Sequence, residues 1–191
     1  EAYLEHRVDG RLYRTKITSL RGDATNAEGI VVNKLRQWSR SDFMPRHDDI
    51  IQERLYCIQW TRKKPSGKGH EYQFRTVTEE DLARERKVED FVRGNLQDWQ
   101  DKGYIPDMRI EVGGPPRYQG LDLVRAGGWT HWHHVFNPRQ LLTAGLINKL
   151  SDARFKFALT QVLNNNCKLS RWLPDGNGQV KGAFDNQALN T

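Results

Sequence analysis

The sequence has little cysteine and no long apolar run. Its 191 residues include two cysteines, Cys57 and Cys167, which form neither a Cys-x-x-Cys pair nor a disulfide framework. Without such a framework, a reducing cytoplasm is the expected location. No stretch approaches the roughly 20 apolar residues of a membrane-spanning helix, and no signal peptide is visible. We therefore expect a cytoplasmic protein that has no membrane partner.

Motifs that carry catalysis are also scarce. The chain has no Gly-x-Gly-x-x-Gly turn, no phosphate loop ending in Lys-Ser or Lys-Thr, and no Gly-x-Ser-x-Gly turn. Cys57 lies in an apolar segment, which is typical of an inert core thiol. A nuclease needs a carboxylate cluster around a metal, and the one dense acidic run, Glu79-Glu80-Asp81, is typical of a helix N-terminus. A stand-alone enzyme is therefore the weakest of the readings that we carry.

Positive charge is unevenly distributed along the chain. The net charge is +6 and the isoelectric point is near 9.4, which favours an acidic partner. Residues 76–104 hold five basic and eight acidic residues, so the rest of the chain carries a net charge of +9. We expect the segment 76–104 to face away from any polyanion.

Strand signals lie in the first half of the chain. Residues 3–17 have the pattern of a β-hairpin around Asp9-Gly10, a strong two-residue turn signal. Residues 54–62 are mostly apolar on both faces, which predicts a central strand, and residues 72–77 alternate and should pair with it. Between the two hairpins, residues 18–29 are small and polar and predict a loop, and residues 30–32 predict a short strand.

Helix signals lie in the second half. Thr78 is a good N-cap, and Gly103 is a typical residue just past a helix end. The stripe of apolar residues between them predicts one buried face: Val88, Phe91, Val92, Leu96 and Trp99. Two shorter helices follow Pro138 and Asp152, after a Gly- and Pro-rich connection at 104–128.

The predicted architecture is α+β, with a small antiparallel sheet packed by a long helix and a C-terminal helix pair. We expect 1–191 to be a single domain, with two small lobes left open. The chain begins with Glu1 rather than methionine, and we expect it to be a piece of a longer protein.

Residues 127–140 concentrate the side chains with most chemical potential. They hold two tryptophans, three histidines and an arginine just before the Pro138 helix, whose N-terminus favours an anion. His-x-His can bind zinc, but on an extended chain His131 and His133 would face away from His134, and no carboxylate or cysteine lies within eight residues. A polar wall or a stacking surface is therefore favoured over a metal site.

Nucleic-acid binding is the function that these local patterns favour. Phosphate-binding candidates are Lys63, Lys64 and Lys68 in a basic loop, together with Arg139, Gln140, Lys168 and Arg171. Stacking candidates for bases are Trp129, Trp132, His133 and Trp172. The alternative is that the lysines are solvated surface residues and the tryptophans are core residues. This alternative is favoured for any single residue, whereas nucleic-acid binding is favoured for the whole set.

Four stretches of the chain, residues 45–60, 128–142, 168–172 and 184–189, carry a family resemblance through their sequence, order and spacing. They resemble the large bacterial and archaeal family of adenine-specific DNA methylases that often sit beside phage-defence genes. The most specific of them is Phe136-Asn137-Pro138-Arg139-Gln140-Leu141-Leu142.

The resemblance implies an internal segment of a methyltransferase. The family binds S-adenosylmethionine upstream of the matched region and presents Asp-Pro-Pro-Tyr downstream, and neither motif occurs here; Gly113-Gly114-Pro115-Pro116 shares only the prolines. No catalytic residue can be carried over, so we expect S-adenosylmethionine only in the parent protein. The implied partners are DNA, in restriction-modification or another phage-defence pathway, and the remaining methyltransferase core. The alternative is a protein-interaction or scaffolding module in which the Trp/His cluster docks a protein.

Overall fold

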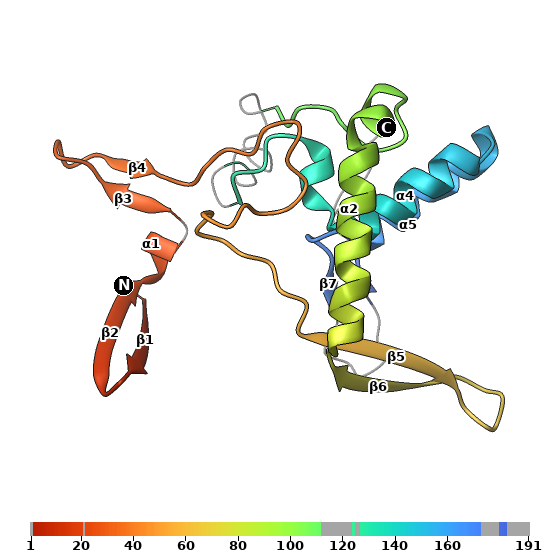
Figure 1. Ribbon diagram of the computed structural model, residues 1–191, viewed down its shortest axis with the longest axis horizontal. Coiled ribbons are helices and arrows are strands. Elements are labelled where there is room, and N and C mark those ends of the chain that lie inside the picture. The colour runs from red at the N-terminus through yellow and green to blue at the C-terminus, as the bar shows by residue number, and fades with distance from the viewer. Residues whose placement is uncertain (1, 21, 112–123, 125–126, 173–179, 183–191) are drawn as a thin grey trace. The chain divides into compact units, whose positions relative to one another are not determined.

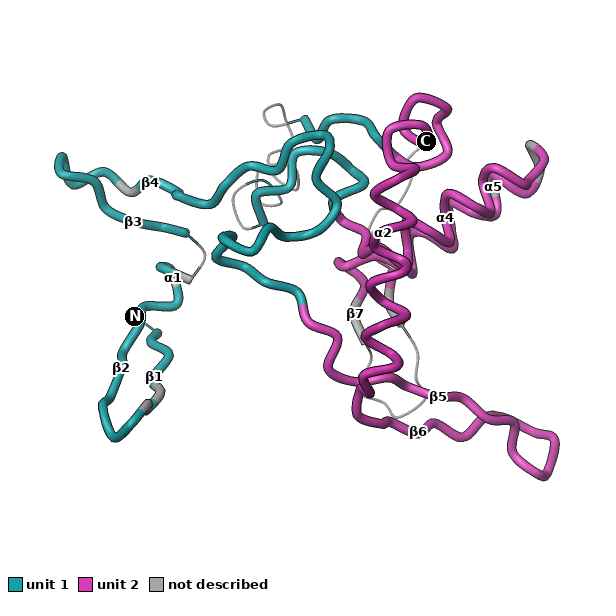
Figure 2. Tube along the Cα trace, in the orientation of Figure 1, with its two compact units in different colours: residues 1–53, 107–134 teal, residues 54–106, 135–191 magenta. Residues whose placement is uncertain are grey.

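The described secondary structure consists of short antiparallel strand pairs and helices, so the fold is α+β (Figure 1). The computed structural model describes residues 2–20, 22–111, 124, 127–172 and 180–182. By backbone proximity the chain divides into two compact units, which are coloured separately in Figure 2. Unit 1 comprises residues 1–53 and 107–134, and unit 2 comprises residues 54–106 and 135–191.

The N-terminal part of unit 1 consists of two small hairpins. The predicted hairpin is confirmed: β1 (Tyr3–Val8) pairs with β2 (Arg11–Lys16). Asp9 and Gly10 both have positive φ, as the tight two-residue turn requires. The predicted strand near Val31 is also confirmed, but the predicted loop at 18–29 is wrong in part. It contains the end of α1 (Ile17–Leu20) and β3 (Asp23–Thr25), which pairs with β4 (Val31–Asn33).

The core of unit 1 lies outside these hairpins. Trp38, Phe43 and Ile110 are buried, and backbone hydrogen bonds join Trp38 N–H to Gly128 O and Ile110 N–H to Thr130 O, each at 2.8 Å. Gly128 has φ of +72°, and a Cβ on it would collide with the carbonyl oxygen of Arg36. Only glycine fits this close approach of two chain segments without strain.

Unit 2 begins with the predicted sheet, which is confirmed as a hairpin of β5 (Cys57–Lys63) and β6 (His70–Thr76). The prediction that residues 54–62 form a central strand is wrong. The sheet has two strands, so both of its faces remain accessible, and Trp60 is 50% and Phe74 64% exposed. The apolar residues on the two faces of this strand therefore lie on two accessible surfaces and are not buried between neighbouring layers.

The long helix α2 (Glu79–Asp101) follows the hairpin. Thr78 is its N-cap, in a capping box with Asp81, and Gly103 follows the C-cap with φ of +66°. Val92, Leu96 and Trp99 are buried as predicted, but Phe91 is 47% exposed, which corrects the predicted stripe. Phe91 lies at the edge of the packed face, with its ring 6.0 Å from that of Trp99.

The C-terminal helix pair is also confirmed, as α4 (Pro138–Leu150) and α5 (Ala153–Asn165). Asn137 caps α4 and forms a capping box with Gln140. Asn148 of α4 donates to Gly103 O at 3.0 Å and Tyr104 O at 2.9 Å, which ties the helix to the end of α2. The described part of the chain also contains three short elements: the 3₁₀ helix η1 (Trp132–Val135), β7 (Arg171–Trp172) and β8 (Val180–Lys181).

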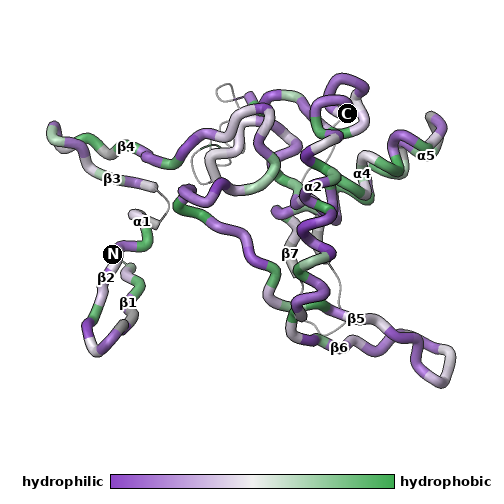
Figure 3. The backbone as a smooth tube through the Cα atoms, viewed as in Figure 1, coloured by the Kyte–Doolittle hydropathy of each residue, from purple (hydrophilic) through white to green (hydrophobic). Residues whose placement is uncertain are grey.

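Hydrophobic residues gather on α4 and α5, as the green segments in Figure 3 show. The buried members include Leu141 at 0%, Ala144 at 2% and Leu159 at 5% exposure. Among the residues that the structure describes, none of the helices has the length and apolar composition that crossing a membrane requires.

Candidate nucleic-acid interface

The β5–β6 hairpin carries three of the predicted phosphate-binding lysines. Lys63 ends β5, and Lys64 and Lys68 lie in the connection to β6; all three are exposed. The connection is held by hydrogen bonds from Lys64 N–H to Gly69 O at 3.2 Å and from Gly67 N–H to Lys64 O at 2.9 Å. Gly67 and Gly69 both adopt positive φ in this turn, at 73° and 81°. The turn therefore groups the lysines at the tip of a two-stranded ribbon.

One face of this ribbon combines aromatic rings with positive charge. Residues opposite one another in antiparallel strands share a face, so the register places Gln59 with Phe74, Thr61 with Tyr72, and Lys63 with His70 on the same side. Tyr72 is 38% and Phe74 64% exposed. This face therefore presents two accessible rings beside the basic tip.

The opposite face has the same character. It carries Trp60 and Arg62 from β5 and Arg75 from β6, and the Arg75 guanidinium lies 4.8 Å from the Trp60 ring centroid. Residues 57–76 hold five basic residues and one acidic residue, Glu71. The exposed aromatic residues and Arg75 were missed in the sequence because the apolar pattern indicated burial. The basic turn was the signal that could have indicated this exposure. A charged turn lies in solvent, and so do the ends of the two strands that it joins.

The predicted site residues on α4 have partners within unit 2. Arg139 forms an ion pair with Glu85 of α2 through its Nε, and its side chain is 49% exposed. The Gln140 side-chain oxygen accepts from Asn137 N–H at 2.9 Å within the capping box. The first turn of α4 is therefore satisfied largely by residues of the protein itself.

Lys168, Arg171 and Trp172 complete the predicted set in unit 2. Lys168 is half-buried, and its ammonium nitrogen is shielded from solvent. The backbone N–H of Lys168 donates to Val135 O at 2.8 Å. The side chains of Arg171 and Trp172 lie outside the described part of the chain, although their backbone forms β7.

The remaining predicted stacking residues, Trp129, Trp132 and His133, belong to unit 1. Both tryptophans are half-buried, and a Cβ on Gly127 would lie 2.9 Å from the Trp129 ring. His133 has no exposed surface, so it presents no ring face to a base from solvent. The structure therefore divides the predicted site residues between the two units.

The histidine cluster differs from its predicted arrangement because η1 replaces the expected extended chain. The three rings gather, with centroid separations of 4.2 Å for His133–His134, 5.4 Å for His131–His134 and 5.6 Å for His131–His133. Within the described residues, no group of three or more His, Cys, Asp or Glu side chains is arranged to hold a metal ion. His133 and His134 are fully buried, which is typical of packed core histidines, whereas His131 is half-buried.

Backbone groups fix the protonation state of His134. Its Nδ1 accepts from Thr130 N–H at 3.1 Å, and its Nε2 lies 3.0 Å from Ser39 O, to which it must donate. This arrangement uses the neutral ring fully. Burial lowers the pKa of His134 to about 3, and the adjacent His133 acts in the same direction. Burial likewise lowers the pKa of His133 to about 4, although Asp107 opposes that shift.

An ion-pair network closes the neighbouring segment of unit 1. The Arg36 guanidinium donates to both carboxylate oxygens of Asp49, at 2.7 and 2.6 Å, and to Asp42 Oδ2 at 2.7 Å. Burial acts to raise the pKa of Asp42, but hydrogen bonds from Ser39, Arg36 and Arg46 together lower it to about 2. These charged groups pair with one another, so the network stabilises unit 1 and leaves little charge to bind a ligand.

Comparison of the chain with protein-family models, with curated proteins and with solved structures finds no match in any of the three. Support for a function therefore comes from the geometry of the chain and from its sequence resemblance. Of the predicted site residues, the hairpin lysines are the ones that the structure groups on an exposed surface.

Proposed function

We propose that this chain is a non-catalytic, DNA-contacting segment of an S-adenosylmethionine-dependent adenine-specific DNA methyltransferase, and that its β5–β6 hairpin makes the contact. The observation that carries the proposal is the hairpin tip, where Lys63, Lys64 and Lys68 are exposed beside accessible aromatic rings. Phosphate contacts by lysine provide sequence-independent affinity for DNA. S-adenosylmethionine and the catalytic step belong to the parent enzyme in this proposal.

The dimensions of a two-stranded ribbon suit duplex DNA. The major groove of B-form DNA is wide enough for such a ribbon, and several DNA-binding proteins insert strands there. A single strand is a second possible substrate, because exposed aromatic rings stack on unpaired bases without regard to sequence. Tyr72 and Phe74, on the same face as Lys63, are the residues that supply this stacking surface.

Charge placement around the hairpin favours the same assignment. Residues 57–76 carry a net charge of +4, whereas residues 76–104, which include α2, carry a net charge of −3. A polyanion is attracted to the hairpin and repelled by the acidic helix. We therefore assign DNA contact to the hairpin and a supporting role to α2.

Fluorescence anisotropy tests the proposal directly. The 191-residue chain is titrated into labelled duplex and labelled single-stranded DNA at low salt. We expect binding to both, with weaker binding when Lys63, Lys64 and Lys68 are all changed to Gln. The matched control changes three other exposed lysines of unit 2, Lys87, Lys149 and Lys156, to Gln. Absence of binding at low salt, or equal losses in the two triple variants, contradicts the proposal.

A scaffolding module is the second candidate, and exposed apolar side chains on the C-terminal helices favour it. Leu150 of α4 is 82% exposed and Phe155 of α5 is 58% exposed. Aromatic side chains such as that of Phe155 are enriched at protein interfaces. In the full-length parent, Leu150→Lys with Phe155→Lys should abolish assembly and retain DNA affinity if this candidate is correct.

A further inference from the structure

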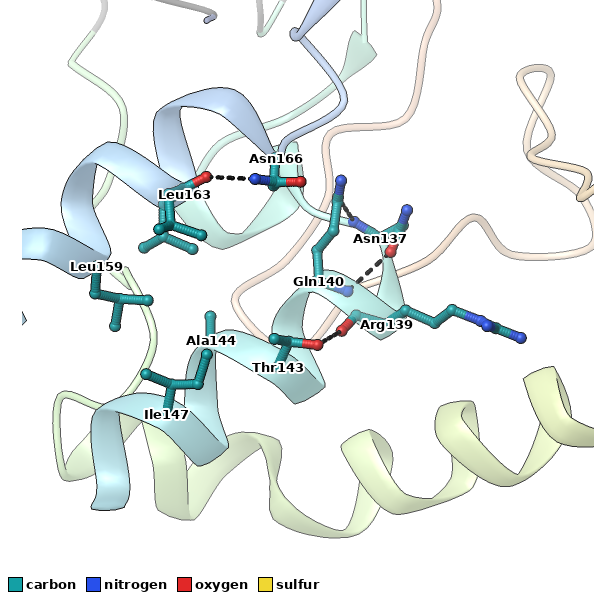
Figure 4. A pocket seen from close by; sticks show the side chains of 10 residues that line it. Asn137, Arg139, Gln140, Thr143, Ala144, Ile147, Leu159, Leu163 and Asn166 are labelled. Atoms are coloured by element: carbon teal, nitrogen blue, oxygen red, sulfur yellow. Dashed lines mark hydrogen bonds between the residues drawn. The ribbon is translucent and has the colours of Figure 1, made fainter. Parts of the chain in front are cut away.

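A cavity of about 250 Å³ lies between α4 and α5 in unit 2 (Figure 4). Its apolar wall is formed by one small and four branched side chains: Ala144, Ile147, Leu159, Val162 and Leu163. Its volume is below the roughly 300–1,000 Å³ that is typical of small-molecule pockets, which restricts the occupant to about one ring system. The branched aliphatic groups of this wall suit the flat face of such a ring.

Two side-chain amides at the start of α4, those of Asn137 and Gln140, line this cavity. The Asn137 side-chain oxygen accepts from Gln140 N–H, and the Gln140 side-chain oxygen accepts from Asn137 N–H, each at 2.9 Å. A backbone N–H needs an acceptor, so the capping box fixes the oxygen of each amide. Both side chains line the cavity, and the capping box leaves the NH₂ group of each amide as a donor.

Two acceptors complete the rim. Asn166, which follows α5, donates its NH₂ to Val162 O at 2.8 Å, which leaves its side-chain oxygen to accept. Thr143 donates its hydroxyl proton to Arg139 O at 2.8 Å, which leaves the oxygen lone pairs. The rim therefore offers both donors and acceptors above an apolar wall.

The charge of the cavity lining points to a neutral ligand. Among the lining residues that the structure describes, Arg139 is the charged one, and its guanidinium is paired with Glu85. In Figure 4 the Arg139 side chain extends away from the apolar wall. An anion such as free phosphate would lack a second cation here and would lie against aliphatic groups.

We propose that this cavity binds a nucleobase. A base has a flat apolar face, an edge that mixes donors and acceptors, and no charge, and Asn and Gln amides are side chains that commonly pair with base edges. This inference rests on the proposed function in one respect: the base would come from an unpaired nucleotide of bound DNA. A free nucleoside tests the cavity without requiring DNA binding.

Nuclear magnetic resonance of the full chain provides the test. The side-chain amide signals of Asn137, Gln140 and Asn166 are followed during titration with adenosine, guanosine, cytidine and thymidine. We expect saturable shifts with at least one nucleoside. Val162→Phe should fill the cavity and weaken binding at least tenfold, and it should be tolerated because Val162 is 46% exposed. The matched control is Gln161→Phe, an exposed neighbour outside the cavity.

Two further variants separate the possible failures. Asn166→Ala removes an acceptor without filling the cavity, so it tests the site if Val162→Phe does not fold. The Lys63, Lys64 and Lys68 triple Gln variant should lose DNA binding and keep nucleoside binding, because the lysines are absent from the cavity lining. Lack of saturable shifts with all four nucleosides, or equal binding by Val162→Phe and wild type, overturns the nucleobase proposal. Loss of DNA binding alone does not.

Discussion

Gly145 of α4 lies directly against the indole ring of Trp99 of α2, and a Cβ on Gly145 would lie 2.5 Å from Trp99 Cζ3 and 3.0 Å from Cδ2. Trp99 is 1% exposed, so its ring has little room to move. Gly145→Ala should therefore lower the free energy of unfolding by about 1–3 kcal/mol, the usual cost of overpacking a core. Urea denaturation, monitored by tryptophan fluorescence, measures this change in the free energy of unfolding.

Gly94→Ala in α2 is the matched control for that substitution. Nothing lies within 4 Å of a Cβ placed on Gly94. Alanine is favoured over glycine inside a helix, so Gly94→Ala should raise the free energy of unfolding by roughly 0.5–1 kcal/mol. Stabilisation by both changes would show that α4 does not pack against Trp99 as described.

The buried histidines should make unit 1 sensitive to acid. The folded pKa values of His133 and His134, about 4 and 3, lie below the unfolded value of 6.5. As pH falls below about 6.5, the histidines bind protons in the unfolded state but not in the folded state. The free energy of unfolding is therefore highest above that pH and decreases below it. The expected slope is about 1.4 kcal/mol per pH unit for each histidine between pH 6 and 4.

Hydrogen-exchange protection measures this effect locally. The Trp38 and Ile110 amides, which donate to Gly128 O and Thr130 O, are suitable probes in unit 1. Their protection factors should decrease between pH 7 and pH 5, and His134→Gln should reduce the dependence by about half. Protection that is equal at the two pH values would be incompatible with buried neutral histidines.

Arg36 should be the most important charged residue for the stability of unit 1. It neutralises Asp42 and Asp49, whose side chains are each 9% exposed. Arg36→Met leaves two nearly buried carboxylates without this partner, and breaking such a pair costs about 3–5 kcal/mol. The control is Arg93→Met, which removes a solvent-exposed pair with Asp90 and should cost no more than about 1 kcal/mol. Similar urea midpoints for the two variants would disprove the structural role of Arg36.

Phe74 should contribute to single-stranded DNA binding through stacking. Its ring is 64% exposed on the face that also carries Lys63. Removal of a stacking ring typically costs about 1–3 kcal/mol, so Phe74→Ala should weaken binding by roughly 5- to 150-fold with little change in stability. Phe155→Ala removes another exposed ring, on α5, and serves as the control in the same anisotropy assay. Equal affinity of the two variants would exclude Phe74 from the interface.

Local signals in the sequence predicted most of the secondary structure. The Asp9-Gly10 turn, the Thr78 cap and the Asn137-Pro138 start each act within a few residues, and each lies where the sequence placed it. Helix caps and two-residue turns satisfy backbone groups with neighbouring atoms, so their outcome depends little on the rest of the chain.

The misplaced features depend on contacts that are distant in the sequence. The apolar pattern of residues 54–62 does not reveal how many strands the sheet contains, which decides whether Trp60 is buried. Likewise, His133 and His134 contact the backbone of residues 39–42, about 90 residues earlier, so a local pattern cannot predict their burial. The lysines of the hairpin tip were identifiable because charge and turn residues coincide there.

The salt dependence of DNA binding tests the central claim most directly. For duplex DNA the slope of log K against log salt is about −0.9 for each phosphate neutralised. Changing Lys63, Lys64 and Lys68 to Gln should therefore reduce the magnitude of that slope by about 2–3. The Lys87, Lys149 and Lys156 triple Gln variant should keep the wild-type slope. A slope that the hairpin variant leaves unchanged would contradict DNA contact by the β5–β6 hairpin.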